Sequence, residues 1–156
     1  MIQRKQSVFL ALAALLGVII FFLDIALIQI SGPEKKSVIL HFTSLEATGV
    51  SIAQPFFYYL IMIFDAIIVA ICIYTILGFR NRPKQIKLCR GIIFLIVLLI
   101  GSMFLLTDKL KGQFIGSTIF YLYALYVPIV MLVLVFLAIQ GISADEKLVR
   151  SADRLR

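Results

Sequence analysis

Four long apolar runs, separated by short polar segments, dominate the chain. They cover residues 8–30, 53–79, 88–107 and 114–140. A helix needs about 20 predominantly apolar residues to cross the hydrocarbon core of a bilayer. The pattern therefore predicts an all-α integral membrane protein, with four transmembrane helices packed as an antiparallel bundle in a single domain, residues 1–156. Because the first run is longer than the roughly 7–15 apolar residues of a secretory signal, we expect it to be an uncleaved first span.

The polar segment between the first two runs has a strand-like pattern. Residues 31–52 begin with a Ser-Gly-Pro break, and from Ser37 to Thr43 the side chains Val38, Leu40 and Phe42 alternate with Ile39, His41 and Thr43. Alternation of this kind indicates a half-buried strand. We therefore predict a small β-hairpin on the exoplasmic surface, with its turn near residues 48–49.

The tail after the fourth run, residues 141–156, predicts a short amphipathic helix on the cytoplasmic side. Ser143 and Glu146 have the spacing of a capping box, which typically begins a helix. Leu148, Ala152 and Leu155 then recur on one helical face. The helix is expected either to lie on an anionic leaflet or to dock against the basic turn or a partner protein.

Positive charge is concentrated beside the apolar runs. The net charge is +7, and eleven of the fifteen Lys and Arg residues fall in three segments. These are Arg4 and Lys5; Arg80, Arg82, Lys84, Lys87 and Arg90; and Lys147, Arg150, Arg154 and Arg156. The positive-inside rule places such segments, and hence both termini, in the cytoplasm. Anionic lipid headgroups are the expected partners there, and no nucleic acid is expected because the basic segments lack interleaved aromatic residues.

Polar side chains inside the apolar runs are the candidates for chemistry. Asp65 is predicted to lie near the bilayer midplane, where a carboxylate costs about 2.5–3.5 kcal/mol on insertion scales. Tyr58, Asp65 and Cys72 recur every seven residues and therefore share one helical stripe. In the fourth run, Tyr126 is the expected hydrogen-bond partner of Asp65, with Tyr123 nearby. The cluster is interpreted either as a proton or solute relay or as a buried hydrogen bond that fixes helix register.

Other residues suggest structural roles. Asp24 is expected either to reach the membrane interface or to pair with Lys109 or Lys111, and Gly91 and Gly101 are expected to let helices approach closely. His41 is the single histidine, and the two cysteines form no Cys-x-x-Cys motif. No nucleophile–base pair, phosphate-binding loop or metal cluster is recognisable. We therefore expect no enzyme activity, no cofactor and no metal.

Three segments together resemble a family of small four-span inner-membrane proteins of the Bacteroidetes, catalogued as domain of unknown function 4293. They are the amino-terminal residues 1–7, the basic turn at residues 81–90 and the tail at residues 145–156. Lys5 departs from the apolar residue expected at its position. The resemblance implies a multi-pass protein of a bacterial inner membrane. It carries no catalytic or binding residues with it.

All three resembling segments are cytoplasmic in the topology that the charges predict. The leading hypothesis is therefore a non-enzymatic accessory or scaffold subunit of a larger inner-membrane complex, which docks a protein partner through its basic turn and tail. The alternative is a small oligomeric transporter or proton-coupled channel that uses Asp65 with Tyr123 or Tyr126.

Overall fold

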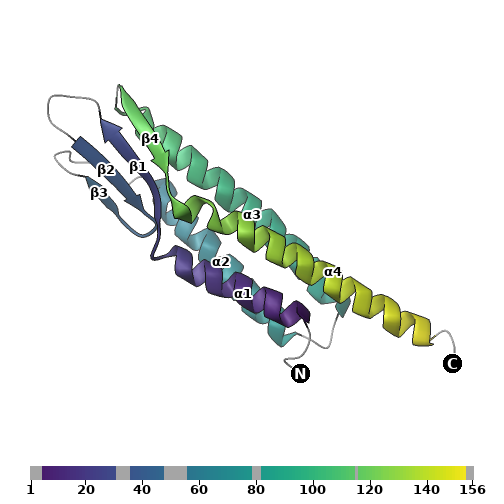
Figure 1. Ribbon diagram of the computed structural model, residues 1–156. Coiled ribbons are helices and arrows are strands. Elements are labelled where there is room, and N and C mark those ends of the chain that lie inside the picture. The colour runs from purple at the N-terminus through teal and green to yellow at the C-terminus, as the bar shows by residue number, and fades with distance from the viewer. Residues whose placement is uncertain (1–4, 31–35, 48–55, 79–81, 115, 154–156) are drawn as a thin grey trace.

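The fold is a bundle of four helices with a small β-sheet at one end (Figure 1). A computed structural model describes residues 5–30, 36–47, 56–78, 82–114 and 116–153. The elements are, in order, α1 (Lys5–Ile20), β1 (Asp24–Ile30), β2 (Lys36–His41), β3 (Leu45–Ala47), α2 (Phe56–Leu77), α3 (Arg82–Lys111), β4 (Ser117–Tyr121), the 3-10 turn η1 (Tyr123–Leu125) and α4 (Val127–Asp153). Helix α1 begins, and α4 ends, at the end of the bundle away from the sheet.

Each helix buries one stripe of side chains at alternating spacings of three and four residues. On α2 the stripe includes Tyr58, Ile61, Asp65, Ile68 and Cys72; on α3 it includes Cys89, Ile92, Ile96, Leu99 and Met103. This spacing is the pattern of helices packed side by side in a left-handed bundle. Accordingly, α1 packs against α2 and α4, and α3 packs against the same two helices.

The outer surface of the bundle is apolar, which is the reverse of a soluble helical protein. Ile63 on α2, Phe94 on α3 and Phe136 on α4 are half or more exposed. Within the described residues, three helices are long and apolar enough to cross a membrane: Tyr58–Leu77, Arg82–Lys111 and Tyr123–Lys147. The chain is therefore a membrane protein. Helix α1 has only 16 residues, so a fourth crossing stays a prediction.

The first predicted span is wrong in its second half. Helix α1 ends at Ile20, and bonds from Phe22 N to Ile19 O and from Leu23 N to Ile20 O close its last turn. Residues Asp24–Ile30 form β1, which pairs with both β2 and β4. Apolar content does not distinguish a buried strand from a helix, and the β-branched residues of this segment favour a strand.

The fourth predicted span begins too early for the same reason. Residues Ser117–Tyr121 form β4, and the helix starts only at Val127, with Pro128 in its first turn where the missing N–H is tolerated. Helix α4 then continues without a break to Asp153. The capping box predicted at Ser143 therefore lies inside a helix and does not begin a separate one.

The sheet contains four antiparallel strands in the order β3-β2-β1-β4. The predicted hairpin is present as β2 and β3, but its turn is at residues 42–44, whereas residues 48–49 lie outside the described residues. In the centre, Ile28 of β1 faces Val38 of β2 and Ile119 of β4. Ile28, Val38 and Leu40 are fully buried, so one face of the sheet extends the core of the bundle.

Candidate functional site

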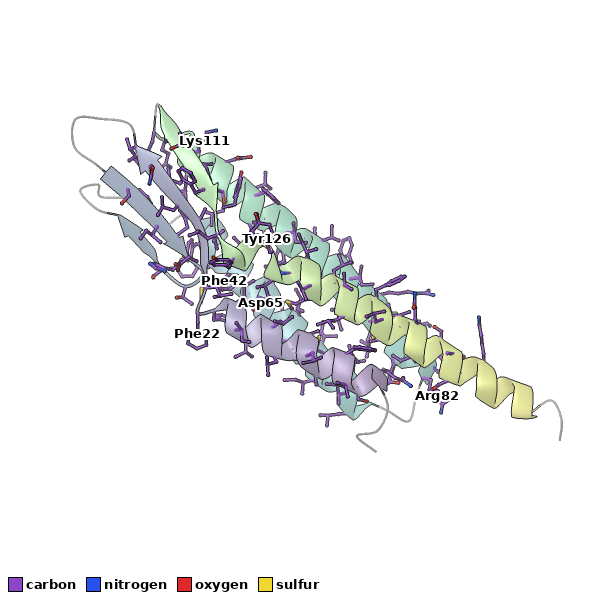
Figure 2. The ribbon with its side chains drawn as sticks, in the orientation of Figure 1. Phe22, Phe42, Asp65, Arg82, Lys111 and Tyr126 are labelled. Atoms are coloured by element: carbon purple, nitrogen blue, oxygen red, sulfur yellow. The ribbon has the colours of Figure 1, made fainter. Side chains whose placement is uncertain are left out.

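Asp65 lies in the interior of the bundle, where α1, α2 and α4 approach one another (Figure 2). Its side chain is 0% exposed, and neither carboxylate oxygen has a hydrogen-bond partner among the described residues. Gly17 of α1 faces it: a Cβ at Gly17 would lie 3.5 Å from Asp65 Oδ1, 3.4 Å from Met131 Cε and 2.5 Å from Val69 Cγ2. We call Gly17, Asp65, Val69 and Met131 the midlevel cluster.

The midlevel cluster is about equally distant from the two ends of α2. Ten residues, or about 15 Å of helix, separate Asp65 from Thr75, whose backbone oxygen accepts a hydrogen bond from Gln85 Nε2 of α3 at 2.8 Å. Nine residues separate Asp65 from the first residue of α2, Phe56. A carboxylate at membrane depth costs about 2.5–3.5 kcal/mol on insertion scales, which makes Asp65 the candidate for chemistry in the bundle interior.

The predicted stripe on α2 is present, but the predicted tyrosine partner of Asp65 is not. Tyr58, Asp65 and Cys72 are all buried on one face of α2. Tyr123 and Tyr126, in contrast, are 77% and 56% exposed. They miss the interior because the helix begins at Val127, which leaves both tyrosines at the rim where α4 meets the sheet.

A second polar cluster, at the junction of sheet and helices, was missed from the sequence. The carboxylate of Asp24 contacts Nδ1 of His41 across the β1–β2 pair, where the two residues are in register. The Tyr58 hydroxyl donates to the backbone oxygens of His41 and Ser44. Asp24 therefore has His41 as a partner, which the sequence did not predict; its predicted pairing with Lys109 or Lys111 stays a prediction. Only recognising residues 24–30 as a strand could have revealed this neighbour.

Replacing Tyr58 by Phe is expected to loosen the sheet from α2. The substitution removes one hydroxyl and leaves the backbone oxygens of His41 and Ser44 without it, a loss of about 1–3 kcal/mol for a buried group. Hydrogen exchange of the β2 amides should become faster, and the unfolding temperature in detergent should fall. The matched control is Tyr123→Phe, because Tyr123 is largely exposed; equal effects of the two variants would contradict this role of Tyr58.

At the opposite end of the bundle, three helices are joined at Asp145 of α4. Gln6 Nε2 of α1 donates to Asp145 Oδ2, and the Arg82 guanidinium of α3 donates to the Asp145 backbone oxygen at 2.7 Å. Lys84 Nζ donates to the Tyr74 hydroxyl at 3.3 Å and lies 5.7 Å from the centre of that ring. The exposed side chains at this end of the bundle include Lys84, Lys87, Arg90 and Lys147. We call the surface formed by these residues and by the Gln6, Arg82 and Asp145 contacts the basic end.

Part of the predicted cationic surface lies outside the residues that the structure describes. Arg80, Arg154 and Arg156 lie outside the described residues. Arg150 belongs to α4, as do Leu148 and Ala152, but their side chains are likewise outside the described part. The docking face predicted for the tail therefore stays a prediction.

Metal-ligating residues do not gather in the described ranges. No group of three His, Cys, Asp or Glu side chains there is close enough to hold a metal ion. Cys72 and Cys89 are free thiols, and both are fully buried.

The model of a family described as "Domain of unknown function (DUF4293)" matches residues 2–155. No curated protein matches the chain.

Proposed function

The chain belongs to the family of domain of unknown function 4293, and on that premise we propose that it is a non-enzymatic accessory or scaffold subunit of a larger membrane complex. Its docking surface is the basic end. In this proposal α1, with the residues that follow it, makes a fourth crossing. The positive-inside rule then places the basic end in the cytoplasm, and the membrane is a bacterial inner membrane, as the family resemblance implies.

The observation that carries the proposal is the joining of three chain segments at Asp145. Contacts from Gln6 and Arg82 hold the start of α1, the start of α3 and the late part of α4 together. Segments far apart in the sequence thereby form one surface with a defined shape. A defined surface suits recognition of a protein, whereas attraction to anionic lipid requires only cations near the headgroups.

The extension of α4 supports the same function. Gly141 packs against Gln6, near the beginning of α1, and α4 continues for twelve further residues to Asp153. Figure 1 shows this last part of α4 reaching beyond the other helices. The sequence places apolar residues on one face of this last part of α4, and a groove in another protein is a common partner for a helix of that kind.

The structure indicates where to truncate the chain to test this function. A chain ending at Lys147 keeps Asp145 and its contacts with Gln6 and Arg82, so the bundle is expected to remain folded. Purified in a mild detergent, the full chain should bring down one partner at fixed stoichiometry, and the chain ending at Lys147 should lose it. Recovery of the full chain alone, or equal recovery of the partner with both chains, would contradict the proposal.

A second candidate function is ion-coupled transport at Asp65. The observation that favours it is the unpaired, fully buried carboxylate of the midlevel cluster, since intramembrane acids often mark ion pathways. Asp65→Asn should then abolish flux across proteoliposome membranes while the protein still assembles. Unchanged flux in this variant would exclude the relay.

A further inference from the structure

A ring of exposed aromatic side chains surrounds the molecule where the helices meet the sheet. Phe22, which follows α1, is 83% exposed, and Tyr123 of η1 is 77% exposed. The other members are Tyr59, Phe104, Phe120, Tyr121 and Tyr126, all exposed. Phe22 and Tyr126 lie on different elements in Figure 2, on either side of the same junction. We call these seven residues the aromatic ring.

Three members of the aromatic ring, Phe22, Tyr59 and Tyr126, lie at a common height above the midlevel cluster. Phe22 follows Gly17 by five residues, Tyr126 precedes Met131 by five, and Tyr59 precedes Asp65 by six. Because Gly17, Asp65 and Met131 meet in one cluster, these offsets place all three aromatic residues about 7–9 Å toward the sheet. Phe104 is brought to the same junction by its edge-to-face contact with Tyr121, with centroids 5.6 Å apart.

On the helical side of the ring, the surface has the character of a lipid-facing wall. Helix α3 carries no charged residue between Arg90 and Phe104, a length of about 21 Å along the helix. Its exposed side chains in that interval include Phe94, Val97 and Leu98. The hydrocarbon core of a bilayer is about 30 Å thick, so this wall accounts for most of one membrane thickness.

On the other side of the ring, the surface is unsuited to hydrocarbon. The sheet is open, with β3 and β4 at its two edges, and backbone groups at an open edge cannot be left unsatisfied in lipid. Ser117, at the start of β4, donates to the backbone oxygen of Lys111 at 3.5 Å. The far half of β4 therefore lies beside the charged last turn of α3, while its Tyr121 end lies in the aromatic ring.

We propose that the aromatic ring is a lipid-contacting collar seated in the headgroup region of one leaflet, with the helices below it in hydrocarbon and most of the sheet above it in water. Tyrosine suits this layer because its six-membered carbon ring is apolar and its hydroxyl is polar. The partner is the glycerol and headgroup layer of any phospholipid, charged or not, because none of the seven collar residues is a cation. This inference rests on the shape and composition of the membrane part and is independent of the proposed docking function.

The absence of tryptophan from the chain gives a direct test. Single tryptophans are introduced into the full chain as Phe22→Trp and Tyr123→Trp in the collar. Phe136→Trp, on the exposed wall of α4, serves as the control for hydrocarbon, and Thr118→Trp, exposed on β4, as the control for water. Each protein is reconstituted in phosphatidylcholine vesicles whose acyl chains carry bromine either near the glycerol or near the chain end.

The collar predicts a distinct order of quenching. Bromine near the glycerol should quench Trp fluorescence of the Phe22→Trp and Tyr123→Trp proteins more than bromine near the chain end. The Phe136→Trp protein should show the reverse order, and the Thr118→Trp protein should be quenched chiefly by aqueous iodide. Stronger quenching of the collar variants by deep bromine would overturn the proposal. So would their insensitivity to both lipids, because that would place a protein partner and not lipid over the collar.

Discussion

Gly17→Ala is expected to lower the free energy of unfolding by about 1–3 kcal/mol, the usual cost of overfilling a packed core. The added Cβ would lie 2.5 Å from Val69 Cγ2, which no pair of carbon atoms tolerates. Val69 cannot turn away at low cost because a β-branched side chain in a helix has one strongly preferred rotamer. Helix α1 must therefore move away from α2, and thermal unfolding in a mild detergent should report the loss.

The matched control is Gly101→Ala on α3. Nothing lies within 4 Å of a Cβ at Gly101, so this variant gains only helix propensity, worth up to about 1 kcal/mol. The two substitutions are chemically identical and should change stability in opposite directions. A loss of similar size at both positions would show that close packing at Gly17 is not what holds α1 in place.

Asp65→Asn is expected to raise the free energy of unfolding by about 1–3 kcal/mol, because charged side chains carry the highest cost at membrane depth. The two side chains have the same shape, so the packing around Gly17 and Met131 should be preserved. Since neither oxygen of Asp65 has a hydrogen-bond partner among the described residues, no native contact is lost. The measurement is again thermal unfolding in detergent; a destabilised variant would reveal a partner that the carboxylate binds in the folded protein.

The apolar runs predicted the membrane character and most of the helices, because hydropathy measures transfer out of water. They could not predict β1 and β4, since a short apolar strand cannot be told from part of a helix by apolar content alone. Residues 24–30 illustrate this: Ile28 pairs on one side with Ile119 of β4, which lies in a distant part of the chain. Pairing of that kind is a tertiary property that local periodicity does not contain.

The same limit explains what was right and wrong at the candidate sites. The stripe of Tyr58, Asp65 and Cys72 is a property of one helix and was predictable from spacing alone. The partner of Asp65 was not, because placing Tyr126 in the interior assumed a helix where the chain forms β4 and η1. Close packing at a glycine likewise depends on which helix lies opposite it. Gly91 and Gly101 were expected to let another helix approach, but nothing lies within 4 Å of a Cβ at either position. Gly17, in contrast, faces Asp65 and Val69.

We propose that the basic end, with the projecting part of α4, holds a protein partner. The most direct measurement is the mass of the intact assembly released from native membranes, compared for the full chain and for the chain ending at Lys147. We expect a single larger assembly for the full chain, and the mass of the bundle alone for the shortened chain. A full chain that carries only lipid, or a shortened chain that keeps the same partner, would contradict it.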